Sequence, residues 1–255
     1  MRVIRLLIRQ IGYEQKLYWR NPSSAVFTFV FPLLLLVIFA SLNTGVAIRS
    51  LGGINYSQYF VPGIAAFGVI SACYTNLAIG LCFRRDTGVL KRIRGTPLPP
   101  WVFLGGTIGS SLVVSAILVA LTTLVGVLFY GVTFPGRWLE LVLALVVGAF
   151  CFCSIGIAMT VLIRSATASP AIVNGVLFPI LFISGTFSPV EPSSIFGRIA
   201  SVFPVRYFEE AMFAVFDPRG TSAGLEIGPL LPMLAWGVGA LIAALRGFRW
   251  EPIRR

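Results

Sequence analysis

The chain has 255 residues, of which 57% are hydrophobic and only 11% are charged, and its mean hydropathy is +0.90. Soluble domains usually carry about a quarter charged residues, so a water-soluble fold is excluded and an integral membrane protein is predicted. A net charge of +11 would suit a nucleic-acid-binding protein. In a membrane protein, however, positive charge collects in cytoplasmic loops, and we expect no nucleic-acid partner.

Residues 1–20 are predicted to form an amphipathic elbow helix at the membrane surface. Apolar and basic side chains recur there at roughly helical spacing, and Tyr13, Tyr18 and Trp19 suit the depth of lipid headgroups. Asn21-Pro22 then marks a turn before the first apolar run.

The fold class predicted for the rest of the chain is an all-α membrane protein with six transmembrane helices. Each apolar run is close to the roughly 20 residues that a spanning helix needs. Gly105, Gly106 and Gly109 in the third run predict close packing against another helix. Since we find no long repeat and no low-complexity linker, residues 1–255 are predicted to form a single transmembrane domain. The runs are 25–42, 59–83, 101–130, 138–163, 168–187 and 227–245.

The distribution of charge between the loops predicts the orientation. If both termini are cytoplasmic, the inner segments hold 15 of the 20 basic residues with 3 acids, and the outer segments hold 5 basic residues with 6 acids. Because basic residues are enriched in cytoplasmic loops, we expect a multi-pass protein of the cell's inner (plasma) membrane with both termini in the cytoplasm. Residues 84–100 would then be cytoplasmic.

Residues 84–100, RRDTGVLKRIRGTPLPP, form the longest polar interval between two apolar runs. Val89, Leu90 and Ile93 are spaced as one apolar face of a short helix, and basic side chains occupy the other faces. Asp86 or Thr87 is expected to cap this helix, and the run from Gly95 to Pro97 is expected to end it.

Such a short helix fits the groove of a soluble partner. A basic anchor to anionic lipid is the alternative; it explains the charges but not the apolar face. The candidate docking residues are Arg84, Arg85, Asp86, Thr87, Gly88, Leu90, Lys91, Arg92, Ile93 and Arg94.

The outer loop 188–226 contains apolar residues at helical spacing, interrupted at Pro204. We predict two short helices joined at the proline. They are too short to span, so they are expected to dip into the outer leaflet as a re-entrant pair shielded by protein. An amphipathic helix lying flat on the membrane is the alternative.

Motifs for catalysis are missing from the sequence. It has no phosphate-binding G-x-x-x-x-G-K-[ST] loop, no H-E-x-x-H and no G-x-S-x-G. It has no histidine, and no acid or base lies near the centre of a predicted span. An intramembrane lipid-modifying enzyme would need ionisable groups there. We therefore expect no enzyme activity, no metal site and no cofactor in this chain itself.

Two stretches resemble the permeases of ABC exporters of the second type. RRDTGVLKRIRGTPLPPWVFLGG resembles the cytoplasmic signature of that family, with Arg85, Gly88, Leu90, Thr96, Pro97 and Leu98 matching the pattern. It departs from the pattern at Asp86, Val89 and Lys91-Arg92. ISGTFSPVEPSSIFGRIASVFPVRYFEEAMFAVF resembles the end of the fifth span and the re-entrant helix, with Pro204, Tyr207, Glu210 and Ala211 fitting the second part.

The resemblance implies a membrane subunit that pairs with a second permease copy or homologue and with two separate ABC ATPase subunits, which would bind ATP and Mg²⁺. The helix within 84–95 would dock on an ATPase, and the fifth span with the re-entrant pair would form the permease interface and outer gate. The dimer would export an amphipathic drug, lipid or glycoconjugate through a pathway set in membrane lipid. A non-transporting scaffold or assembly factor is the alternative function. The implied gate residues are Asn174, Phe178, Phe182, Phe187, Pro204, Tyr207 and Glu210.

Overall fold

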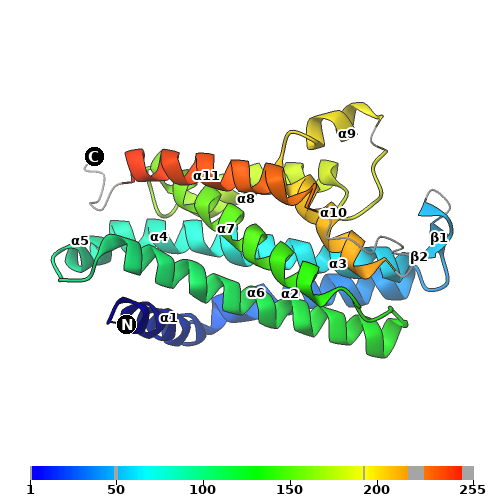
Figure 1. The fold of residues 1–255 in the computed structure, drawn as a ribbon, viewed down its shortest axis with the longest axis horizontal. Helices are drawn as coiled ribbons and strands as arrows, with labels where there is room; N and C mark the ends of the chain where they lie inside the picture. Colours follow the sequence, from blue (N-terminus) through cyan, green and yellow to red (C-terminus); the bar gives the residue numbers. More distant parts are fainter. Residues whose placement is uncertain (1, 49–50, 192, 218–226, 249–255) are drawn as a thin grey trace.

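The computed structural model describes residues 2–48, 51–191, 193–217 and 227–248, and within them the chain is an elongated bundle of helices (Figure 1). The elements in chain order are α1 (Arg2–Trp19), α2 (Pro22–Leu42), β1 (Ala47–Ile48), β2 (Ile54–Asn55), α3 (Tyr56–Ile70), a π-helical turn (Ser71–Asn76), α4 (Leu77–Asp86), α5 (Val89–Arg94), α6 (Pro100–Tyr130), α7 (Trp138–Leu162), α8 (Ser169–Ser184), α9 (Ile195–Ala200), α10 (Pro204–Phe216) and α11 (Leu230–Gly247).

The core of the bundle is the continuous element Tyr56–Asp86, made of α3, the π-helical turn and α4. In its most apolar window 72% of the residues are buried, against 22% in α2 and 17% in α11. Helix α3 contacts α2, α6 and α10, and α4 contacts α7 and α8. The outer helices are apolar yet exposed, as expected where lipid or another chain covers them.

Five helices of the described residues are long and apolar enough to cross a membrane. They correspond to the first four and the last of the predicted apolar runs. The remaining run, 168–187, forms only α8, whose 16 residues span about 24 Å, less than the roughly 30 Å of a bilayer core. The helix ends at Gly185. The φ of 104° at this residue lies in the left-handed region, which favours glycine and cannot continue a right-handed α-helix.

The predicted elbow helix forms α1, which packs along α6. The contact depends on the glycines that the sequence singled out. A Cβ atom on Gly106 would lie 2.2 Å from Cγ of Gln10, and one on Gly109 would lie 2.7 Å from Cδ1 of Ile11. The prediction of close helix packing at these glycines is confirmed, with α1 as the partner helix.

The two ends of the bundle differ in Figure 1. The start of α1, helix α5 and the end of α11 lie together at one end, which we call the α5 end. At the opposite end, β1 and β2 pair antiparallel, with Ala47 opposite Asn55 and Ile48 opposite Ile54. We call this the hairpin end.

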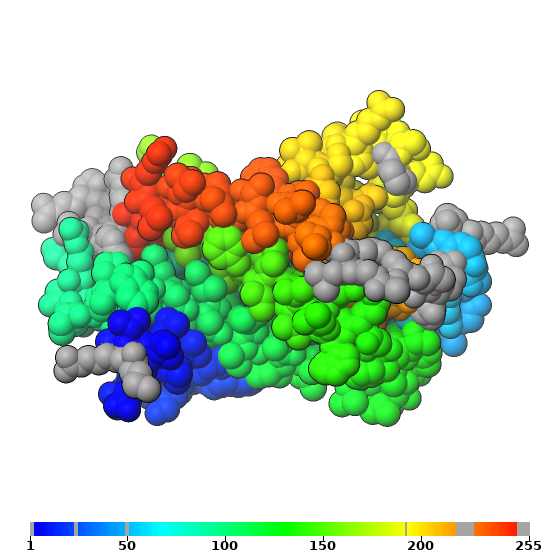
Figure 2. All heavy atoms as spheres, in the orientation of Figure 1, coloured from blue at the N-terminus to red at the C-terminus, as the bar shows by residue number. Residues whose placement is uncertain are grey.

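The predicted pair of short helices is present as α9 and α10, and Pro204 is the first residue of α10. Helix α10 packs against α3, α7 and α11, and the ring of Phe208 fills the space beside Gly148 of α7. Helix α9 projects from the bundle, as Figure 2 shows in yellow, and its Ile195 and Phe196 are exposed. Residues 218–226 of the predicted outer loop lie outside the described residues.

Candidate functional site: the junction between α4 and α5

The predicted docking helix forms α5, six residues long, directly after α4. Gly88 makes the turn between the two helices, with a φ of 73° in the left-handed region. Helix α5 ends at Arg94, where the amide nitrogen of Gly95 donates to the carbonyls of Lys91 and Arg92. The predicted end of this helix at Gly95 is therefore confirmed.

Arg84 connects the junction to α1. Its guanidinium donates two hydrogen bonds to the Glu14 carboxylate, at 2.7 and 3.0 Å, and lies 5.9 Å from the ring centre of Phe103 on α6. Gln10 donates a further bond to the same carboxylate at 3.1 Å. Only 7% of the Glu14 side chain is exposed, so a bidentate pair joins the elbow helix to the end of α4 away from bulk water.

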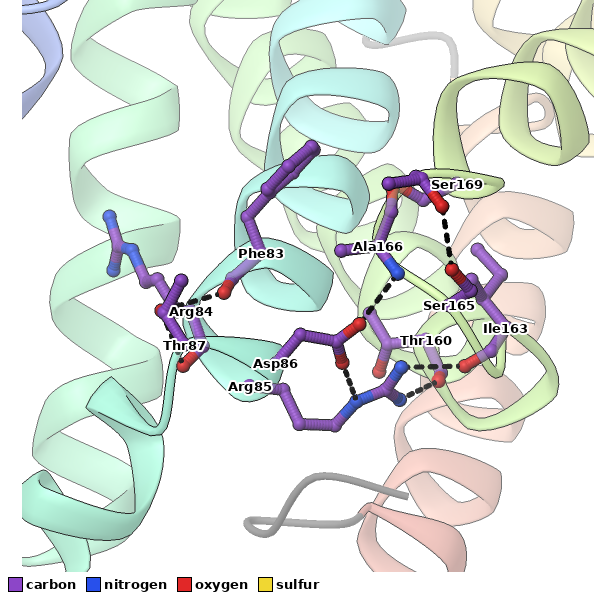
Figure 3. Close-up of polar contacts among 11 residues, drawn as sticks. Phe83, Arg84, Arg85, Asp86, Thr87, Thr160, Ile163, Ser165, Ala166 and Ser169 are labelled. Carbon is purple, nitrogen blue, oxygen red and sulfur yellow. Dashed lines mark hydrogen bonds and ion pairs between the residues drawn. The ribbon is translucent and has the colours of Figure 1, made fainter. Parts of the chain in front are cut away.

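Arg85 connects the junction to α7. Its guanidinium donates to the backbone carbonyls of Thr160 and Ile163, at 2.9 and 2.8 Å, as Figure 3 shows. These carbonyls are at the C-terminal end of α7, where the last turn of a helix lacks partners and carries partial negative charge. Arg85 is only 2% exposed. The buried guanidinium of Arg85 thus caps the C-terminal end of α7.

Asp86 connects the junction to the segment that leads from α7 to α8. One carboxylate oxygen accepts a bond from the amide nitrogen of Ala166 at 2.7 Å, and the other lies 3.3 Å from Nε of Arg85. Ser169, the first residue of α8, donates its hydroxyl to the carbonyl of Ala166 at 2.6 Å. Three consecutive residues of α4 therefore contact α1, the end of α7 and the segment between α7 and α8. Figure 3 shows the last two of these contacts.

The predicted capping of α5 by Asp86 or Thr87 is wrong. The Asp86 carboxylate accepts a hydrogen bond from the amide of Ala166, and the Thr87 hydroxyl donates to the carbonyl of Phe83 at 2.8 Å. Gly88 occupies the cap position, and it has no side chain that could cap α5. The tight turn points both side chains back toward α4 and α7, so neither reaches the start of the new helix.

The expected apolar face of α5 is divided between the interior and the surface. Leu90 is fully buried in the core of its own chain, so it cannot be part of a docking surface. Ile93 is half-buried, whereas 37% of Val89 is exposed. Lys91, Arg92 and Arg94 are exposed. The surface that α5 presents is accordingly basic, with Val89 as its most accessible apolar side chain.

The implied gate residues lie on α8, in the segment after it and on α10. Phe182 is 65% exposed and its ring centre lies 5.0 Å from that of Phe187, which in turn lies 6.2 Å from the ring of Phe67 on α3. Phe178 is 39% exposed on the same helix, and Asn174 is half-buried one turn earlier. The rings of Phe182, Phe187 and Phe67 therefore form a continuous chain of contacts from α8 to α3.

The gate residues of α10 are held by contacts inside their own segment. Pro204 is buried at the first turn. The Tyr207 hydroxyl donates to the carbonyl of Ser201 at 2.7 Å, which fixes the bend between α9 and α10. Glu210 pairs with Arg206 at 2.6 Å, one helical turn away. Helix α10 contacts α8, but among the described residues no hydrogen bond, ion pair or ring contact joins these three residues to the α8 aromatics.

Sequence reasoning missed Glu209. Its carboxylate is buried and accepts a hydrogen bond from the Thr186 hydroxyl at 2.7 Å. It lines a cavity of about 170 Å³ at the hairpin end together with Tyr59, whose hydroxyl donates to the carbonyl of Gly185. Burial raises the pKa of Glu209 to about 8, although the bond from Thr186 opposes the shift. Its position four residues after Val205 on the buried face of α10 was a signal available in the sequence.

Glu14 was missed as well, although it is the only acid among the first twenty residues. An acid on an otherwise basic helix is the pattern that could have identified it as the partner of a buried arginine. Within the described ranges, no group of three or more His, Cys, Asp or Glu side chains is placed to hold a metal ion.

Two comparisons with known proteins found matches to this chain. Residues 6–216 match the family described as ABC-2 type transporter. Over 155 residues the chain is 27% identical to the inner membrane transport permease YadH of Escherichia coli strain K12, and it has the same identity to the protein of that name in Shigella flexneri. The matched segment covers 59% of this chain and 58% of each relative. Since the family match extends over most of its length, the chain belongs to the ABC-2 type transporter family.

Proposed function

We propose that this chain is the membrane-spanning subunit of an ATP-driven exporter, with α5 docking on a separate ATPase subunit. Family membership makes the chain a membrane permease of an ABC transporter that is not itself an ATPase. The observation that carries the rest is the α4–α5 junction. Arg84, Arg85 and Asp86 join the only short basic helix at the α5 end of the described bundle to three other elements at once.

The excess of basic residues at the α5 end supports its assignment to the cytoplasm. Exposed arginines and lysines of α1 and α5 lie there, together with Arg164 after α7 and Arg246 at the end of α11. At the hairpin end, by contrast, Arg137 and Arg206 are each paired with a glutamate at 2.6 Å. Both termini would then be cytoplasmic in a protein of the inner membrane.

Movement of α5 would be transmitted by the contacts of the junction. When two ATPases close around ATP and Mg²⁺, a push on the exposed face of α5 would reach α1 through the Arg84–Glu14 pair. It would reach the end of α7 through Arg85, and the start of α8 through Asp86 and Ala166. Because these bonds are short and at least partly buried, the four elements would move together rather than slide.

Helix α8 carries the motion toward the hairpin end, where we place the gate. Its exposed Phe182, the neighbouring Phe187 and helix α10 would contact a second permease copy or a homologue, and the pathway would form between the two. The short span of α8 and the buried position of α10 favour a re-entrant outer segment over a helix lying flat. An amphipathic drug, lipid or glycoconjugate is the class of cargo that such an apolar pathway would export.

The docking role is tested by reversing charge on the exposed face of α5. We expect Arg92→Glu combined with Arg94→Glu to abolish co-purification with the cognate ATPase and to remove permease-stimulated ATP turnover in nanodiscs. The matched control is Arg5→Glu with Arg9→Glu, which reverses two exposed charges of α1 at the same end. If the α5 double variant binds the ATPase and supports ATP turnover as well as the α1 double variant and the wild type do, the docking role is rejected. A scaffold that needs no ATPase is then favoured.

A further inference from the structure

A cavity of about 500 Å³ lies beside the junction, between α1, the continuous element Tyr56–Asp86 and α6. Its size is within the range of roughly 300 to 1,000 Å³ that is typical of small-molecule sites. The Arg84–Glu14 pair forms part of the wall, and Leu17, Leu77 and Val114 contribute apolar surface. A wall with both an ion pair and apolar side chains is suited to an amphiphile.

Residues of the π-helical turn Ser71–Asn76 and Gly80 line the cavity. The wider turn places Ala72 and Asn76 on the cavity wall, and Asn76 is held there by a 2.7 Å hydrogen bond to the Thr28 hydroxyl of α2. Gly80 also lines the cavity, and a Cβ atom at this position would meet nothing within 4 Å. π-helical turns inside α-helices occur frequently at functional sites.

The charges of the wall select the headgroup. Arg84 is 22% exposed and Glu14 is 7% exposed, so the two charges face a poorly hydrated space and compensate each other. A purely anionic headgroup would meet the Glu14 carboxylate, and a purely cationic one would meet the Arg84 guanidinium. A zwitterion can instead place its phosphate near the guanidinium and its ammonium near the carboxylate. A primary ammonium, as in phosphatidylethanolamine, can also donate hydrogen bonds to that carboxylate, whereas the trimethylammonium of phosphatidylcholine has no donor.

We propose that this cavity binds the headgroup of a zwitterionic phospholipid, phosphatidylethanolamine, from the leaflet at the α5 end. The apolar side of the cavity would contact the upper part of an acyl chain, and the remainder of the lipid would stay in the bilayer. The assignment of that leaflet to the cytoplasm rests on the proposed function. Occupancy would compete with the Arg84–Glu14 pair, so a bound lipid would loosen the connection between α1 and α4.

The test uses the purified full-length chain, without ATPase or nucleotide, in phosphatidylcholine nanodiscs that contain a small fraction of photoreactive phosphatidylethanolamine. Crosslinks are mapped by mass spectrometry to peptides that contain the cavity wall. Gly80→Leu fills the cavity without a backbone clash, and we expect it to reduce labelling of these peptides by at least about tenfold. Gly239→Leu is the control, because Gly239 lies in the groove between α7 and α11 and also has open space around it.

A second variant tests the selection by charge. In wild type, photoreactive phosphatidylethanolamine is expected to label the cavity more strongly than photoreactive phosphatidylglycerol. Glu14→Gln leaves Arg84 uncompensated, so the preference should reverse toward the anionic lipid, whereas a purely structural role would weaken both labels equally. Retained labelling in Gly80→Leu, or equal labelling of wild type by both lipids, would overturn the proposal. Because no ATPase is present, this result is independent of the docking role of α5.

Discussion

Replacement of Arg85 by methionine is the most direct test of the junction. Arg85 is buried, and it satisfies the carbonyls of Thr160 and Ile163 at the end of α7. Methionine is apolar and unbranched and reaches as far as the Nε position of arginine, so it fills the space of the arginine stem but donates no hydrogen bond. Both carbonyls, which belong to buried residues, then lose their charged donor, and Asp86 loses its neighbouring cation.

The cost follows from these contacts. A hydrogen bond to a charged group contributes about 1.5 to 3 kcal/mol, and a buried polar group left without its partner costs about 1 to 3 kcal/mol. Burying methionine instead of a guanidinium recovers part of this loss. We therefore expect Arg85→Met to lower the free energy of unfolding by about 3 kcal/mol.

The measurement is unfolding in mixed micelles with increasing denaturing detergent, followed by circular dichroism. Arg94→Met is the matched control, because Arg94 is exposed on α5 and such surface changes usually stay within about 0.5 kcal/mol. Arg85→Lys should be intermediate, since an ammonium group lacks the planar fork that contacts two carbonyls together. If Arg85→Met and Arg94→Met unfold at the same detergent concentration, the structural role assigned to Arg85 is wrong.

Three further predictions concern packing and protonation. Gly106→Val should detach α1 from α6 and cost about 1 to 3 kcal/mol, because its Cβ would collide with Gln10. Gly12→Val is the matched control in the same unfolding assay: Gly12 has open space around it and valine is no poorer a helix former than glycine, so stability should not fall. Leu90→Asp should prevent folded, monodisperse protein from accumulating, as judged by size-exclusion chromatography, since it buries a carboxylate in the core. The pKa of Glu209 is raised to about 8 from an ordinary value of 4.5, so its contribution to stability is present at low pH and is lost as the pH rises through about 8. Glu209→Gln, which is neutral at every pH, should abolish that loss in thermal unfolding measured from about pH 6 to about pH 9, and an unchanged pH profile would contradict it.

Local patterns in the sequence were sufficient to predict most helices. The runs 25–42, 101–130 and 138–163 correspond to α2, α6 and α7 within a few residues. The break at Pro204 and the end of α5 at Gly95 were also predicted correctly. These features depend on hydrophobic length and on the backbone restrictions of proline and glycine, which act over a few neighbouring residues.

The predictions that failed concern which neighbour a side chain meets. The apolar spacing of Val89, Leu90 and Ile93 correctly indicated a helix face, but it could not show that the bundle itself buries Leu90. Likewise, Asp86 is a suitable capping residue by type, yet its carboxylate accepts a hydrogen bond from the amide of Ala166, eighty positions away.

By itself, the sequence determined a membrane-embedded helical chain, the positions of its long helices and the short basic helix after the second span. Hydrophobic length, charge distribution and the restrictions of proline and glycine act locally, so they can be read without knowing the packing. Only the tertiary structure decided that Arg84, Arg85 and Asp86 bind three separate elements and that a cavity lies beside Glu14. Those features depend on distances between segments far apart along the chain, which are set when the helices pack together.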